Sequence, residues 1–168
     1  MAVAEGRNGL VTVRTGTGTT DRTVAELGTW SIGGISRNMI DITAFGDTVM
    51  KYAPGMMNAG TITFSGFCDA GSTGQAALVA AINSGLYICN KTTSALLGNS
   101  SSIKRLKLWA NDDTSQPEFG FWSCSGSSGK IFFNSMDIGQ DKNGVASISF
   151  TAQVSHGVLA WSTVAKIP

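Results

Sequence analysis

The chain has 168 residues, only 14% of them charged, and a formal net charge of +1. Soluble domains usually carry about 25% charged residues, so this surface has little self-repulsion. The near-neutral charge also excludes a general attraction to nucleic acid or to an anionic membrane. The length suits one domain with a well-buried core.

The N-terminal sequence MAVAEGRNGL carries Glu5 and Arg7 early and has no apolar h-region, so it does not read as a secretory signal. The longest apolar run, 76–82, is too short to cross a bilayer. We therefore expect a protein without a membrane anchor.

Three widely separated cysteines, Cys68, Cys89 and Cys124, form no CxxC pair. In the absence of a secretory signal we interpret them as reduced thiols, mostly in the core. The single histidine, His156, stands apart from them, so no metal site and no cofactor is expected.

Residues 1–23 are rich in Gly, Thr and Arg and have little apolar surface to bury. The sequence predicts a flexible N-terminal arm here and a single domain over 24–168. Either the arm is a free tail, or it orders on a neighbouring subunit. In the second case its candidate docking residues are Arg7, Arg14 and Arg22.

After a predicted strand at 24–32 comes a long apolar excursion, about 33–57, interpreted as a β-hairpin with turns at 46–47 and 54–55. Loops this long in a compact domain are usually functional or bury their surface against something else. Apolar residues that do not fold back onto their own core need a partner. The candidate subunit-interface residues are Met39, Ile40, Ile42, Phe45, Val49, Met50 and Tyr52.

The next two elements have clear patterns. Alternation between Thr61 and Cys68 sets Ile62 and Phe64 on one face and predicts a half-buried strand. Ser72, with Gln75 three residues later, forms a capping-box pattern that opens a helix over about 72–84.

Further strands are predicted at 86–90, 103–110, 117–124, 130–138, 145–154 and 158–161. In 103–110 the alternation places Leu106 and Leu108 inward and Arg105, Lys107 and Trp109 on the other face, where the basic side chains would form a solvated or rim surface. The fold class is therefore mainly β: an antiparallel β-sandwich or barrel with one α-helix and a long β-hairpin excursion.

No group of residues indicates catalysis. A Ser–His or Cys–His pair would have to use His156, which follows a strand at a turn. The acidic pair Asp112 and Asp113 lies in a polar segment typical of turns. The sequence predicts that the protein is not an enzyme.

The segment from 27 to about 85 carries an ordered set of short motifs: Ile-Asp-Ile-Thr at 40–43, Gly-Asp at 46–47, Pro-Gly at 54–55, Gly-Thr-Ile-Thr-Phe at 60–64, Asp69 and the helix from Ser72. In this order they resemble the major tail tube proteins of bacteriophages with long, non-contractile tails. The later strands agree in order and kind, without a sharp motif.

The resemblance implies a structural virion protein that forms hexameric rings, stacked into a hollow tube around a tape-measure protein. The genome DNA would pass through without sequence-specific binding. Tail terminator and tail-tip proteins would be further partners, with assembly in the host cytoplasm and final location in the virion tail. The hairpin would line or join the tube wall, which makes its four charges lumen or rim candidates: Arg37, Asp41, Asp47 and Lys51.

Two other classes stay open at this point. Another self-assembling β-sandwich, or a carbohydrate-binding one that uses tryptophans as sugar platforms, would have a similar composition. The four candidate platforms are Trp30, Trp109, Trp122 and Trp161. The missing secretory signal disfavours the carbohydrate-binding class.

Overall fold

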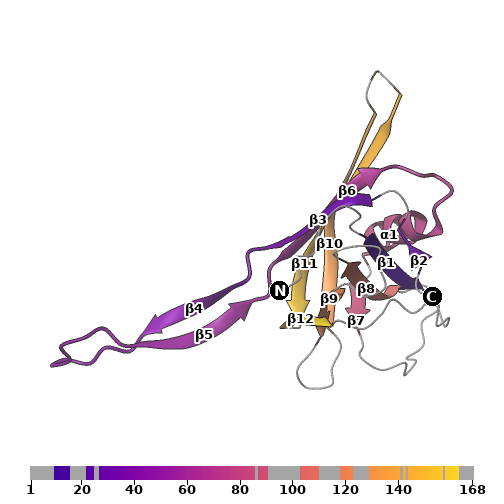
Figure 1. Cartoon of the computed structure of the whole chain (residues 1–168). Helices are drawn as coiled ribbons and strands as arrows, with labels where there is room; N and C mark the ends of the chain where they lie inside the picture. The colour runs from indigo at the N-terminus through magenta and orange to yellow at the C-terminus, as the bar shows by residue number, and fades with distance from the viewer. Residues whose placement is uncertain are drawn as a thin grey trace, which may run out of the picture.

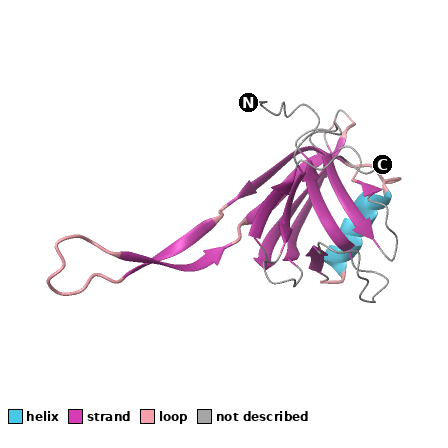
Figure 2. Cartoon of the chain, turned by 60° about the horizontal axis from the view of Figure 1, so that its bottom comes forward, coloured by secondary structure: helices cyan, strands magenta, loops and turns pink. Residues whose placement is uncertain are grey.

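The protein is described from a computed structural model, which places residues 10–15, 22–24, 27–85, 87–90, 103–109, 118–122, 129–140, 142, 144–156 and 158–162. Most of these residues form two five-stranded antiparallel sheets and one helix, and a separate two-stranded ribbon leaves this body (Figures 1 and 2). The predicted fold class is confirmed, including the single helix and the long hairpin.

The first sheet, sheet A, has the strand order β12-β9-β8-β1-β2. Its strands are β1 (Leu10–Thr15), β2 (Arg22–Thr23), β8 (Ile103–Trp109), β9 (Glu118–Trp122) and β12 (Val158–Ser162). The second, sheet B, has the order β3-β6-β11-β10-β7. Its strands are β3 (Leu27–Gly33), β6 (Thr61–Phe67), β7 (Tyr87–Asn90), β10 (Gly129–Gln140) and β11 (Ala146–His156). The ribbon pairs β4 (Ser36–Asp41) with β5 (Tyr52–Asn58).

The core lies between the two sheets because the central strands alternate apolar and polar residues. Ile62 and Phe64 of β6 are buried, while Thr63 between them is exposed. β11 repeats the pattern, and sheet A contributes residues of β1 and β8. The other buried core residues of these strands are Val11, Val13, Leu106, Leu108, Ile148, Phe150, Ala152 and Val154.

The helix α1 (Thr73–Asn83) begins as the capping pattern predicts, with the Ser72 hydroxyl accepting a hydrogen bond from the Gln75 amide at 3.3 Å. The Gln75 side chain donates to the carbonyl of Phe67 at 2.8 Å and accepts from the amide of Asp69 at 3.0 Å. These bonds tie the first turn to the end of β6, and Leu78 then packs into the core.

The predicted flexible arm over 1–23 is wrong for residues 10–15 and 22–23, which are strands of sheet A. Val11 and Val13 are fully buried, because β1 pairs with β8, more than ninety residues further along the chain. Of the arm arginines, Arg14 lies on β1 and Arg22 is exposed on β2, while Arg7 lies outside the described residues.

The predicted solvated or rim position is also wrong for Lys107 of β8, whose exposed fraction is only 6%, and Trp109 on the same face is 2% exposed. The Lys107 ammonium lies 5.1 Å from the centroid of the Trp109 ring, a cation–π distance. The Trp109 indole donates to the Thr12 hydroxyl at 3.1 Å. Both faces of β8 are therefore covered. The side chain of Arg105 lies outside the described residues.

The tryptophans that can be placed are structural. Trp30 donates from its indole to the carbonyl of Trp109 at 2.8 Å and packs against the core, so neither ring is presented as a sugar platform. Trp122 and Trp161 have side chains outside the described set.

Cys68 is a free, half-buried thiol. Within the described residues, no helix has the length and apolar character to cross a membrane, and no three His, Cys, Asp or Glu side chains come together as metal ligands.

Candidate functional site: the protruding ribbon

The ribbon, defined here as residues 36–58, leaves the body as a continuation of β3 and β6 and extends far beyond it (Figures 1 and 2). Of the thirteen large hydrophobic side chains that are exposed in the described residues, nine lie between Ile35 and Met56. Their exposure follows from the extended position of the ribbon, where no part of the described body covers them.

All seven predicted interface residues lie on this ribbon, with exposed fractions from 51% to 111%. They are Met39, Ile40, Ile42, Phe45, Val49, Met50 and Tyr52. The expected exposure in a single chain is thus observed, and the interface role stays a prediction.

The ribbon is apolar on both faces. The register places Asp41 opposite Tyr52 and Ile40 opposite Ala53. Because neighbouring residues of a strand point to opposite faces, Tyr52 and Met39 share one face while Ile40 lies on the other. A strand pair that covers its own core hides one apolar face. This one has two apolar faces, and among the described residues only Met57, near its root, packs against the core. The rest of the ribbon therefore has room for partners on both sides.

The turn predicted at 54–55 is wrong: Pro54 lies inside β5, opposite Met39. Each strand of a two-stranded ribbon has an unpaired edge, where the missing N–H of proline breaks no ladder bond. The register shifts between Arg37 and Met39, and this irregularity takes up the extra residue next to Gly55.

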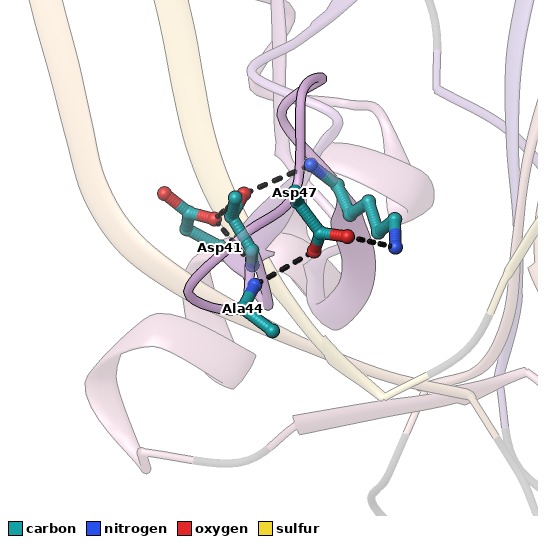
Figure 3. A network of polar contacts seen from close by, with 5 residues as sticks. Asp41, Ala44 and Asp47 are labelled. Carbon is teal, nitrogen blue, oxygen red and sulfur yellow. Dashed lines mark hydrogen bonds and ion pairs between the residues drawn. The ribbon is translucent and has the colours of Figure 1, made fainter.

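A network of polar contacts shapes the tip (Figure 3). The Asp41 carboxylate accepts from the Thr43 amide at 2.9 Å and from its hydroxyl at 2.6 Å. The Thr43 hydroxyl accepts from the Lys51 amide at 2.9 Å, which closes the two strands on each other. Asp47 accepts from the Ala44 amide at 2.8 Å and pairs with the Lys51 ammonium.

The four charges predicted for the lumen or rim are therefore engaged within the ribbon. Asp41, Asp47 and Lys51 hold the tip, and the Arg37 guanidinium reaches the Gly55 carbonyl at 3.4 Å. The Thr43 hydroxyl, followed by its amide, holds the pKa of Asp41 below its ordinary value. The Lys51 ammonium, followed by the Ala44 amide, does the same for the pKa of Asp47.

These pKa shifts predict a tip that loses its order in acid. A carboxylate with a depressed folded-state pKa stabilises the fold fully above its unfolded value, about 3.9 for Asp. That contribution is lost as the pH falls through the lower, folded pKa. We expect the amide proton resonances of Thr43 and Ala44 in NMR spectra to move together with the two carboxylates, with midpoints below about 3.9.

The variant Asp47→Asn is the control for this titration. The Ala44 amide donates to Asp47, so its resonance should no longer depend on pH in this variant. The Thr43 amide donates to Asp41, so its pH dependence should stay in place. Midpoints at or above the ordinary aspartate value would contradict the network.

Two glycines with left-handed backbone lie where the ribbon joins the body, Gly34 with φ +70° and Gly60 with φ +90°. A Cβ on Gly60 would lie 2.4 Å from the Gly33 carbonyl oxygen. The Gly60 carbonyl accepts from the Val154 amide at 3.0 Å and from the Gln153 side chain at 2.9 Å. The sequence predictions did not include this root, although glycines stand at both ends of the excursion and were a signal for it.

Replacing Gly60 with Ala should destabilise the protein by at least about 1–2 kcal/mol, since a left-handed backbone costs that much for a residue with a Cβ. The steric overlap with the Gly33 carbonyl adds to this loss of stability. It should also change the direction in which the ribbon leaves the body. Urea denaturation measures the stability.

Gly33→Ala is the matched control at the same root, because nothing lies within 4 Å of a Cβ there and its backbone is not left-handed. It should change the stability by less than about 0.5 kcal/mol, as surface substitutions usually do. Equal losses in the two variants would show that the root does not require glycine at 60.

No protein-family description matches this chain, and no curated protein matches it. Solved structures do match. A chain from the tail of an empty gene transfer agent particle with C6 symmetry is 15% identical, covers 94% of this chain and 98% of its own length, and has a TM-score of 0.61. A chain of the SPP1 tail tube is 13% identical over 98% of this chain and 80% of its own, with a TM-score of 0.57.

A chain from the sheath–tube complex of PVC, an extracellular contractile injection system, is 17% identical over 95% of this chain and 91% of its own, with a TM-score of 0.59. At such low identity the similarity establishes the fold and not the activity. The chain has the fold found in these tail and tube assemblies, as the sequence resemblance implied.

Proposed function

We propose that this chain is a structural, non-enzymatic subunit that assembles with copies of itself into the stacked hexameric rings of a phage-type tail tube. The observation that carries the proposal is the ribbon: apolar on both faces, exposed along its length and directed away from its own core. A monomer with such a surface is prone to association. In a ring or stack of identical subunits, the same surface is covered by neighbours.

The fold shared with the gene transfer agent tail and the SPP1 tail tube supports this assignment. From the same role we propose that the tube surrounds a tape-measure protein, ends on terminator and tail-tip proteins, and is assembled in the host cytoplasm before it becomes part of the virion.

Passage of genome DNA through the tube is compatible with the outer face of sheet B. On β3, β6 and β11 the residues that point away from the core are mostly hydroxyl-bearing: Thr29, Ser31, Thr61, Thr63, Ser65, Ser147, Ser149 and Thr151. Several bond one another across the strands, as Ser31 and Thr63 do at 2.6 Å. A neutral hydroxyl face would not hold phosphate as a lysine- and arginine-rich one does.

Negative-stain electron microscopy of the purified full chain over a concentration series tests the proposal. We expect monomers when dilute, and rings and hollow tubes when concentrated or when seeded with tail tips. A chain that stays monomeric at millimolar concentration, with and without tail tips, would overturn the proposed function.

A further inference from the structure

We propose that the apolar tip of the ribbon docks on a second copy of the chain, at an acceptor surface formed by Phe67 and Val145 at the far end of sheet B. The inference rests on the proposed function and deepens it by naming the surface that receives the ribbon.

The acceptor surface is the second place where exposed hydrophobic residues gather among the described residues. Outside the ribbon and its root, the large exposed apolar side chains are Phe67, Phe132, Ile138 and Val145. Three of these four lie at one end of sheet B, where β6 stops and the β10–β11 hairpin projects beyond the body (Figure 1).

The register brings Phe67 and Val145 to the same face of that end. Phe67 lies opposite Ser147, and Val145 is two residues before Ser147, so alternation directs both side chains outward. The amide of Cys68 donates to the carbonyl of Ala146 at 2.9 Å, which continues the pairing to Val145. Diagonal neighbours of this kind are within reach of an aromatic side chain.

The acceptor surface and the ribbon lie at opposite ends of the same strand. The ribbon root joins β6 at Gly60 and Thr61, and Phe67 is its last residue. Seven residues of strand separate the two by about 20 Å. Two different surfaces at opposite ends give a head-to-tail contact, in which each copy receives one ribbon and extends another. Such a contact is not used up when two copies meet, so it can join further copies into a ring or, between rings, along a stack.

The chemistry of the tip fits this acceptor. The tip carries four large exposed apolar side chains, Ile42, Phe45, Val49 and Met50, and the last three are each more than two-thirds exposed. Methionine sulfur makes favourable contacts with aromatic rings such as Phe67. The four charges of the whole ribbon, Arg37, Asp41, Asp47 and Lys51, sum to zero, so no net charge on the ribbon opposes apolar docking.

Two complementary variants test the contact. Variant R, Ile42→Asp with Phe45→Asp, has a disabled ribbon and an intact acceptor. Variant P, Phe67→Asp with Val145→Asp, has an intact ribbon and a disabled acceptor. Neither should form tubes alone. When mixed, they should form a complex in light scattering that is larger than either variant alone but does not elongate, because each junction leaves only disabled surfaces outside.

The control Thr63→Asp places a charge on the same face of β6, away from both surfaces, and should assemble like the wild type. The acceptor assignment is wrong if variant P alone forms tubes. It is also wrong if the light scattering of a mixture of R and P equals the sum of the scattering from the two separate samples. Association of P alone into closed pairs would indicate ribbon–ribbon contact instead. Failure of the wild type to form rings or tubes would overturn the proposed function, which is a different outcome.

Crosslinking keeps the test decisive if variant P does not fold. Chains carrying Phe45→Cys and chains carrying Val145→Cys, co-assembled and then oxidised, should give a disulfide-linked dimer of the two chain types. Chains of one type, treated alone, give the background from the native thiols. If the amount of disulfide-linked dimer in tubes assembled from the mixture does not exceed this background, the proposed contact is wrong.

Discussion

Replacing Ile42 and Phe45 with aspartate should abolish tube formation and leave the thermal midpoint of the monomer nearly unchanged. Both side chains are exposed in the single chain, at 54% and 111%, so their loss removes no core contact. Each such side chain, once covered, contributes roughly 1.5–3 kcal/mol before the ordering costs of association. A buried, unpaired carboxylate opposes association further, and the effect recurs at every subunit of every ring.

Circular dichroism on the dilute monomer measures the thermal midpoint, and electron microscopy of the concentrated protein shows whether tubes form. The matched control, Ile42→Leu with Phe45→Tyr, keeps the apolar area and should still assemble. If the aspartate variant instead unfolds the monomer, the ribbon belongs to the intramolecular core, and the structural argument for a tube subunit fails.

The sequence predicted the ribbon and the central strands of sheet B well, for a physical reason. β6 and β11 have one face on the core and one in solvent, so Ile62, Phe64 and Phe150 alternate with hydroxyl residues. The helix was equally clear, since Ser72 and Gln75 form a local signal. Where burial follows a local pattern, a single sequence is sufficient.

The missed features depend on pairing between distant segments. β1 is short, lies among Gly and Thr, and is stabilised by its distant partner β8. Lys107 is buried beside Trp109, against the expectation for a lysine in an alternating strand. The role of Gly60 depends on the Gly33 carbonyl, twenty-seven residues earlier. None of these contacts has a short-range signature.

Replacing Phe150 with Ala should have the largest effect on the fold, costing about 3–5 kcal/mol, as for other large-to-small changes of a buried phenylalanine. Phe150 is 1% exposed, at the centre of an aromatic cluster. Its ring centroid lies 5.2 Å from that of Phe64 and 6.2 Å from that of Phe133, the latter edge to face. The substitution removes both aromatic contacts and leaves a cavity between the sheets.

Phe67→Ala is the matched comparison, because it deletes the same ring from the neighbouring strand at a site that is 55% exposed. In urea denaturation it should cost less than about 1 kcal/mol, since little packing is lost at an exposed position. The two variants should also differ in assembly. Phe150→Ala reduces the folded population and lowers tube yield only through that loss, whereas Phe67→Ala leaves the subunit folded and weakens the contact between copies. Similar stability losses in the two variants would contradict the division between a folding core and an assembly surface.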